Sequence, residues 1–259
     1  MAERQVKSKE RVADHGEVFT AQREVNAMLD LVKQETERID SRFLEPACGD
    51  GNFLAEILRR KLEAAKRLSH QTCLNRKTLQ RTVLKAIDKP LFEKNAYIAA
   101  TSIYGVDILQ DNVEECRKRL FDIWNEEYTS VCQGECTEEC REAVRFILSR
   151  NILCGNALTL KQVNAAGEDT EAPIIFSEWV FTGESSVKRS DYRLDALMRD
   201  DTDADRRHRQ TSLLDTDEDK QEWMIDAESG KAFPKPIKEY PPVYYWKVQK
   251  SKRAERSTQ

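Results

Sequence analysis

The feature that most constrains this chain is the segment FLEPACGDGNF at residues 43–53. Apolar residues lead into an acidic residue and a proline, a Gly-x-Gly turn follows, and residues 53–60 have a helical pattern. The segment therefore predicts a strand, a glycine turn and a helix in that order. Gly49 and Gly51 let the backbone bend sharply and leave room for a ligand against the main chain. A Gly-x-Gly turn alone is common, so its meaning depends on the rest of the sequence.

Length and composition limit the class of protein. The 259 residues suit one large domain, or one domain with a long extension. Charged residues make up 34% and the net charge is −4, so any contact with nucleic acid needs a local basic patch. No apolar run is long enough to span a membrane, and residues 1–5 carry no apolar signal segment. These observations predict a cytoplasmic protein with no membrane partner.

Apolar runs and helical patterns alternate along the first two thirds of the chain. Strands are predicted at residues 42–46, 102–107, 151–154 and 173–177. Helices are predicted from Thr20 onward and at residues 52–68, 78–87, 111–124 and 137–148. This alternation predicts a doubly wound α/β fold, with a mostly parallel sheet and crossovers on both faces. The stretch 65–100 is longer than a crossover needs and is predicted to be a helical insertion.

Polar residues follow the predicted strands. Asp107, Asn156 and Ser177 stand at strand ends, as does the glycine turn, and ligands bind at the carboxyl ends of parallel strands. The Asp107 carboxylate suits the two hydroxyls of a ribose. The glycine turn lacks the Gly-Lys-Ser/Thr of a triphosphate loop, and its spacing to Asp107 is too long for a dinucleotide fingerprint. An uncharged nucleoside ligand therefore fits better.

The glycine segment resembles a known motif. Residues 45–53 are similar to the S-adenosylmethionine-binding motif D/E-P-A-C-G-x-G-x-F of adenine-N6 DNA methyltransferases from bacterial restriction-modification systems. Three further segments resemble motifs of that family, in the right order: GEVFT at 16–20, YGVD at 104–107 and GNAL at 155–158. Ala21 replaces a family proline and Asn156 replaces an aspartate. The resemblance covers about residues 11–180.

This resemblance implies a Rossmann-like methyltransferase domain over residues 1–181 and S-adenosylmethionine as the cofactor. The activity that it implies is methyl transfer to the exocyclic amine of adenine in DNA. In the family, the matching residues cover the methionine end (Phe19, Thr20), hold the ribose (Asp107) and hold the adenine (Asn156). The full set of implied cofactor-binding residues is Phe19, Thr20, Glu45, Pro46, Ala47, Gly49, Gly51, Phe53, Asp107, Asn156 and Leu158.

This chain departs most from the family pattern at the catalytic motif. The family has D/N/S-P-P-Y/F/W after the fourth strand, where a polar head holds the flipped base and an aromatic ring stacks on it. Here Ser177, Glu178 and Trp179 stand at that place, without the prolines. Ser177 would be the polar head, Glu178 an acceptor for the amine and Trp179 the stacking ring. The alternative is that these side chains only pack. The segment YPPVY at 240–244 has no polar head and is predicted to be a turn with packed tyrosines.

Residues 182–259 are predicted to be an irregular, charged and partly disordered extension. Its acidic segment, 200–219, suits a solvated loop. The basic end, Lys247 to Arg256, follows Tyr244 and Trp246, and either contacts phosphates and bases or is simply solvated. Predicted partners are DNA as substrate and a specificity, restriction or second methyltransferase subunit.

Three cysteines stand four residues apart, at Cys132, Cys136 and Cys140. On one helix they would share a face, which either packs or binds zinc with a fourth ligand. Cys-x2-Cys pairs are absent, and the prediction names no metal site. Two rival functions stay open beside the DNA methyltransferase. One is a noncatalytic S-adenosylmethionine-binding scaffold or regulator of a restriction or phage-defence assembly, and the other is a methyltransferase acting on RNA, protein or a small molecule.

Overall fold

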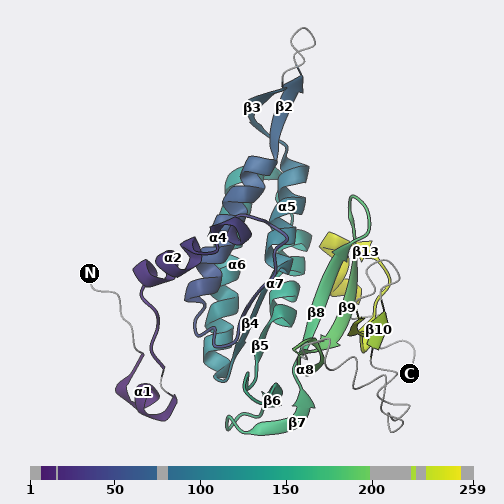
Figure 1. Ribbon diagram of the computed structural model, residues 1–259. Coiled ribbons are helices and arrows are strands. Elements are labelled where there is room, and N and C mark those ends of the chain that lie inside the picture. Colours follow the sequence, from purple (N-terminus) through teal and green to yellow (C-terminus); the bar gives the residue numbers. More distant parts are fainter. Residues whose placement is uncertain (1–6, 16, 75–80, 199–222, 226–231, 252–259) are drawn as a thin grey trace.

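A three-stranded parallel sheet lies at the centre of the computed structural model (Figure 1), which describes residues 7–15, 17–74, 81–198, 223–225 and 232–251. Its strands are β1 (Phe43–Glu45), β4 (Ile103–Asp107) and β5 (Ile152–Cys154), in the order β1-β4-β5. Each pairing is parallel, with Glu45 opposite Gly105 and Asp107 opposite Cys154. The prediction of an α/β fold with a parallel sheet is confirmed at this level.

Long helices connect these strands. They are α4 (Asn52–Leu68), α5 (Lys89–Thr101), α6 (Gln110–Cys132) and α7 (Glu138–Asn151). Two begin with side-chain caps that satisfy free main-chain N–H groups. The Asp88 carboxylate accepts from the Leu91 N–H at 3.0 Å, and the Thr137 hydroxyl accepts from the Cys140 N–H at 3.2 Å.

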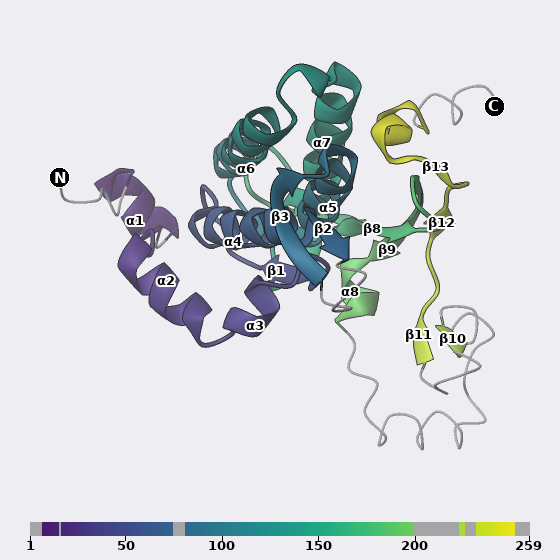
Figure 2. The ribbon, with the colours of Figure 1, turned by 90° about the horizontal axis from the view of Figure 1, so that it is seen from above.

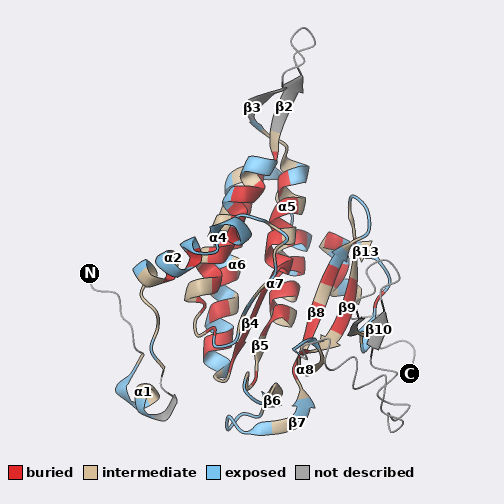
Figure 3. Cartoon of the chain, viewed as in Figure 1, coloured by how far each residue is buried: buried red, intermediate tan, exposed pale blue. Residues whose placement is uncertain are grey.

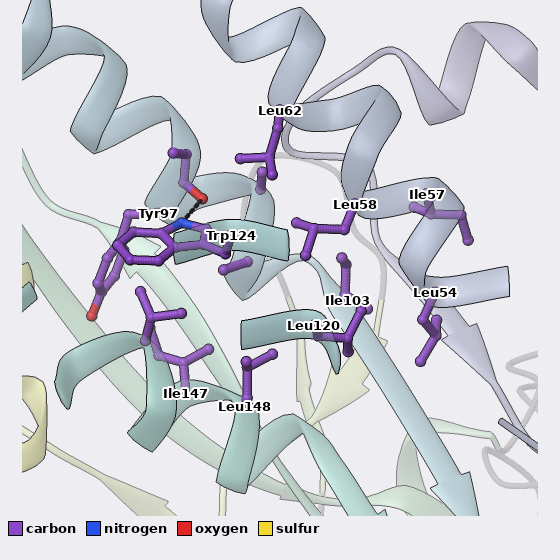
Figure 4. Close-up of a cluster of buried hydrophobic side chains, with 14 of the residues drawn as sticks. Leu54, Ile57, Leu58, Leu62, Tyr97, Ile103, Leu120, Trp124, Ile147 and Leu148 are labelled. Carbon is purple, nitrogen blue, oxygen red and sulfur yellow. Dashed lines mark hydrogen bonds between the residues drawn. The ribbon is translucent and has the colours of Figure 1, made fainter. Parts of the chain in front are cut away.

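The main core lies between these helices and one face of the sheet (Figure 4). Ile103 and Ile152 point from the sheet toward the helices and are fully buried. Trp124 fills the centre of the core, and its indole N–H donates to the Ala96 carbonyl at 3.1 Å. Buried positions on α4 to α7 therefore face inward, as Figure 3 shows.

The other face of the sheet is covered mainly by a β-hairpin. β8 (Ile175–Phe181) pairs antiparallel with β9 (Ser186–Arg193). Phe176 of this hairpin packs on Tyr104 of the sheet, with ring centres 5.2 Å apart, and Leu194 of the short helix α8 (Leu194–Leu197) joins the same cluster. The prediction of crossover helices on both faces is wrong for the described residues, because a hairpin takes that position.

Strand β8 runs against the direction of the parallel sheet. Its start lies at the carboxyl edge, where the Ile174 N–H donates to the Leu160 carbonyl beyond β5. Its later residues lie at the amino edge, where the Trp179 indole donates to Asn151 at 3.0 Å and Glu178 pairs with Arg42. The strand predicted at 173–177 therefore exists, but it is antiparallel and does not end at the carboxyl edge.

The insertion between β1 and β4 is a hairpin followed by a helix. β2 (His70–Leu74) pairs antiparallel with β3 (Arg81–Ile87), and the hairpin projects away from the helices (Figure 1). The helix predicted at 78–87 is wrong, since residues 81–87 form a strand and residues 75–80 lie outside the described part. The run RTVLKAI contains β-branched residues that favour a strand. In the described part of residues 65–100, the helical residues belong to the end of α4 and to α5.

Much of the predicted extension belongs to the folded core. β12 (Lys238–Glu239) and β13 (Val243–Tyr244) pair with β9, and the 3₁₀ segment η2 (Tyr245–Lys250) packs on α7. Tyr245 is buried, and its hydroxyl donates to Glu93 at 2.7 Å. The predicted boundary at residue 181 therefore does not separate a folded domain from a loose extension. The acidic segment 200–219 and residues 252–256 lie outside the described residues.

Smaller elements complete the chain. The N-terminal helices α1 (Lys9–His15), α2 (Gln22–Asp30) and α3 (Lys33–Thr36) lie outside α4, as Figure 2 shows. Two further antiparallel pairs are β6 (Lys161–Val163) with β7 (Asp169–Pro173) and β10 (Trp223–Ile225) with β11 (Ala232–Pro234). The turn η1 (Gln133–Glu135) joins α6 to α7. None of the helices in the described ranges combines the length and apolar character needed to cross a membrane.

Candidate cofactor site at the carboxyl edge of the sheet

The glycine turn adopts a conformation that needs both glycines. Gly49 and Gly51 have φ angles of 53° and 91°, which L-residues with side chains rarely adopt. A Cβ on Gly51 would lie 2.7 Å from the Cys116 sulfur, and one on Gly49 would lie 3.0 Å from the Phe19 ring. The Cys48 N–H donates to the Val106 carbonyl at 2.9 Å, which ties the turn to β4. The strand, turn and helix predicted from residues 43–60 are present.

Asp107 joins the end of β4 to this turn. Its carboxylate accepts from the Gly49 N–H at 2.9 Å through Oδ2, and from the Leu109 N–H at 2.9 Å and Asn112 Nδ2 at 3.2 Å through Oδ1. The residue is only 9% exposed. A carboxylate offers about four lone-pair sites, and three are used here. Asp107 therefore stands where the ribose contact is predicted, but it also organises the loop, and about one acceptor site is left for a ligand.

Asn112 is a central residue of the site that the sequence analysis missed. It is buried near the start of α6, and its Nδ2 donates both to Asp107 and to Glu17 Oε1, the latter at 2.7 Å. Its Oδ1 accepts from Lys7 Nζ at 2.7 Å and from Arg11 at 3.1 Å. A polar residue next to the buried Val113 on a predicted helix is the one signal in the sequence that points to it.

The N-terminal segment lies over the glycine turn. The Phe19 ring contacts Gly49, and Lys7 Nζ lies 5.9 Å from the centre of that ring. The Thr20 carbonyl accepts from Asn52 Nδ2 at 3.0 Å, next to the start of α4. Phe19 and Thr20 therefore lie beside the glycine turn.

Two acidic side chains near the turn have raised pKa values because burial disfavours their charged forms. They are Glu45, at the end of β1, and Asp50, between the two glycines. Arg119 lies 3.4 Å from the Asp50 carboxylate and opposes this effect. Glu45 accepts from the Ala47 N–H at 3.4 Å, so it also shapes the turn. Pro46 and Ala47 form its outer part, and Phe53 follows in the first turn of α4.

The turn after β5 also lies at the carboxyl edge. Its Asn156 amide, which is predicted to hold the adenine, is instead bonded within the protein. The Gly155 N–H donates to the Asp107 carbonyl at 2.9 Å. Asn156 Oδ1 accepts from the N–H of Leu158 at 3.0 Å, and its Nδ2 donates to Asp169 on β7 at 3.0 Å. The amide of Asn156 is therefore bonded to its own turn and to β7, and Leu158 is 95% exposed.

The predicted catalytic side chains Ser177 and Trp179 face the interior. Ser177 is fully buried; its hydroxyl donates to Asp191 at 2.6 Å and accepts from Arg189 Nε at 3.1 Å. Trp179 is 7% exposed and its indole is bound by Asn151. Both lie within β8 rather than after it. Both side chains are part of the packing in this structure. This favours the alternative that they only pack, rather than the assignment of Ser177 as polar head and Trp179 as stacking ring.

Glu178 alternates to the opposite side of β8. It forms an ion pair of 2.5 Å with Arg42, next to a cavity of about 430 Å³ that is lined by Leu44, Tyr104 and Tyr192 among others. Arg42 precedes β1, whereas the glycine turn follows it. With a rise of about 3.3 Å per strand residue, the two ends of β1 are well separated. The Glu178–Arg42 pair therefore lies at the amino edge of the sheet, whereas the glycine turn lies at the carboxyl edge.

Two further predictions concern packing. Tyr240 is buried, its hydroxyl donates to Asp191 at 3.2 Å, and Arg189 lies 4.1 Å from its ring centre, so the YPPVY segment does contain a packed tyrosine. The three cysteines do not share one helix: Cys132 ends α6, Cys136 follows η1, and Cys140 is on α7. In the described part of the chain, no cluster of three or more His, Cys, Asp or Glu side chains is arranged to hold a metal.

Comparisons with protein-family models, with curated proteins and with solved structures gave no match for this chain.

Proposed function

We propose that this chain is the methyl-transferring chain of a DNA methyltransferase of the adenine-N6 type and that it binds S-adenosylmethionine at the carboxyl edge of the sheet. The observation that carries the proposal is the hydrogen bond from the Gly49 N–H to Asp107. It joins a glycine turn with two left-handed residues to the carboxylate at the end of the neighbouring strand. In parallel sheets this edge is the ordinary place for nucleoside ligands.

The residues at this edge fit the cofactor. Gly51 is buried against Cys116, and Gly49 is half-buried under the Phe19 ring. Asp107 keeps about one acceptor site for a ribose hydroxyl. A ligand would reach the Gly49 main chain once the Phe19 ring moves aside. Asn156 would contact the adenine only if its amide left the turn it now closes. When bound, the cofactor supplies an activated methyl group, and the chain's task is to hold it in line with the accepting amine.

A second candidate is a noncatalytic S-adenosylmethionine-binding subunit. It is favoured by one observation, namely that Ser177 and Trp179 are buried and that Glu178 pairs with Arg42 away from the glycine turn. The acceptor site would then belong to another chain, such as a specificity, restriction or second methyltransferase subunit. Acceptors other than DNA, namely RNA, protein or a small molecule, belong to a third candidate.

Two measurements separate these candidates. Calorimetry of the full chain with S-adenosylmethionine should show saturable binding, and its absence would remove all three candidates together. Transfer of tritiated methyl from the cofactor is then measured with adenine-containing DNA, with the chain alone and with products of neighbouring genes. Label in DNA from the chain alone supports the catalytic candidate, and label only with a partner supports the noncatalytic one. Label in RNA or protein but not in DNA would favour the third.

A further inference from the structure

The segment that covers the glycine turn is held down by two cations on one acidic surface. Arg11 of α1 contacts the Asp111 carboxylate at 2.5 Å and Glu17 at 2.7 Å. Lys7 contacts Glu115 at 2.5 Å and Asp111 at 3.6 Å. Asp111 and Glu115 lie in the first turns of α6, just after Asp107. The two cations therefore fasten the segment beside the candidate ribose contact.

These ion pairs hold Phe19 against the glycine turn. Glu17, two residues before Phe19, is bonded to both Arg11 and Asn112. Lys7 lies over the Phe19 ring itself. Beyond Phe19, the Thr20 carbonyl is held by Asn52. The ring that faces Gly49 is thus fixed from both sides.

No described side chain of this segment, in residues 7–13 and 17–20, is part of the hydrophobic core, although the Glu17 side chain is only 8% exposed through its polar contacts. In Figure 3 the described part of α1 is exposed or intermediate. The side chains of Asp111 and Glu115 are 54% and 57% exposed. Ion pairs of this kind are individually weak and are screened by salt. Val25 of α2, by contrast, is fully buried, so firm packing begins only after this segment.

We propose that residues 7–15 and 17–20 form an ionic latch that closes the candidate cofactor site in the absence of ligand. Phe19 occupies the space above Gly49 that a ligand on the bare main chain would need. A ligand therefore reaches the turn only when Arg11 and Lys7 release α6 and Glu17 leaves Asn112. Because only the open form admits ligand, weakening the latch raises the association rate. The identity of the ligand rests on the function proposed above, whereas opening of the latch does not.

The latch is tested without ligand through the Gly49 amide. This N–H is fixed by Asp107 next to the Phe19 ring, so its ¹H–¹⁵N signal carries a ring-current shift whose loss is calibrated with Phe19→Leu. In Lys7→Gln/Arg11→Gln the signal should move most of the way to the Phe19→Leu position. Raising NaCl from about 0.05 to about 0.5 M should move the wild-type signal in the same direction.

The matched control is Arg23→Gln/Lys33→Gln, which removes two exposed cations that pair with Glu24 and Glu37 outside the site. Its Gly49 signal should stay at the wild-type position. A wild-type signal in the latch variant and at high salt would overturn the latch.

Association of S-adenosylmethionine is then followed by stopped flow. The latch variant should bind about three to ten times faster than the control, as expected from losing two partly exposed ion pairs. Equal association rates would overturn the gating role. If the wild type binds no S-adenosylmethionine, the proposed cofactor fails, and the Gly49 signal still decides whether the latch exists.

Discussion

The Gly49 N–H and the Asp107 carboxylate lie 2.9 Å apart, and this bond holds the candidate cofactor site together. Gly49 belongs to the turn after β1 and Asp107 ends β4, so one contact aligns two strand ends. The same carboxylate accepts from Leu109 and Asn112, which start the loop into α6. The shape of the candidate site and the proposed binding of ligand therefore both depend on the Asp107 side chain.

Asp107→Asn should weaken both. The amide has one acceptor oxygen and one donor NH₂, so either Gly49 or Leu109 loses its acceptor and faces a second donor. We expect a loss of about 1–3 kcal/mol in the free energy of unfolding, as for a buried donor left unsatisfied. Binding of S-adenosylmethionine should fall at least tenfold. Urea denaturation and calorimetry measure the two effects.

The matched control for this variant is Asp122→Asn, an exposed residue of α6 whose carboxylate pairs with Lys118 at 2.6 Å. It should change neither quantity measurably, since surface ion pairs contribute little. An Asp107→Asn protein that matches the control in stability would contradict the role given to the Gly49 contact.

Gly49→Ala should weaken the binding of S-adenosylmethionine, in addition to lowering the free energy of unfolding. The new methyl group would meet the Phe19 ring at 3.0 Å in a backbone conformation with φ of 53°. Gly167→Ala is a matched control, because Gly167 also has positive φ, 79°, but lies in the β6–β7 turn with no atom near its added Cβ. Both variants should lose about 1 kcal/mol from strain alone. Only Gly49→Ala should bind S-adenosylmethionine more weakly, and equal binding by the two variants would exclude the turn as a ligand contact.

Local patterns made part of the site predictable. Gly49, Gly51, Phe19 and Asp107 each stand in a short segment whose strand, turn or cap is decided by its own residues, and the sheet brings these segments to one edge. The placement of a strand depends instead on distant partners. β8 was predicted as a parallel strand because its pairing with β9 could not be recognised.

The reason lies in the charges of β9. Arg189 and Asp191 look like surface residues in the sequence, but both are buried, pair at 2.7 Å and bind Ser177. A buried ion pair with satisfied hydrogen bonds is an exception to the ordinary pattern of charge outside. For the same reason the sequence does not predict the folded part of residues 182–259. Their charged composition alone indicates a loose extension.

Ser177→Ala tests whether Ser177 is structural or catalytic. Removing the hydroxyl leaves Asp191 and Arg189 with one partner fewer in a buried network. We expect a loss of about 1–3 kcal/mol in the free energy of unfolding, with unchanged binding of S-adenosylmethionine. Ser149→Ala is a control of the same chemistry, since that hydroxyl donates within α7 to the Phe146 carbonyl and is half-buried. Loss of methyl transfer at full stability would restore Ser177 as a catalytic residue.

The pKa of Asp111 reports on the latch. The hydrogen bond from Arg11, assisted by Lys7, lowers the pKa of this carboxyl below its ordinary value near 3.9. Because the folded pKa is depressed, the contribution of the pair to stability is present above the ordinary value and is lost as the pH falls through the folded value. The latch should therefore be insensitive to pH between about 5 and 8 as far as Asp111 is concerned.

A titration of the Asp111 carboxyl carbon by ¹³C NMR measures this directly. In the wild type the midpoint should lie below that of an unpaired aspartate, and Arg11→Gln should raise it toward the ordinary value, because the first cause of the shift is removed. Arg23→Gln should leave it in place, since Arg23 pairs with Glu24 on α2. An ordinary midpoint in the wild type would mean that Arg11 does not hold α6 in solution, and the segment over Gly49 would then be open at neutral pH.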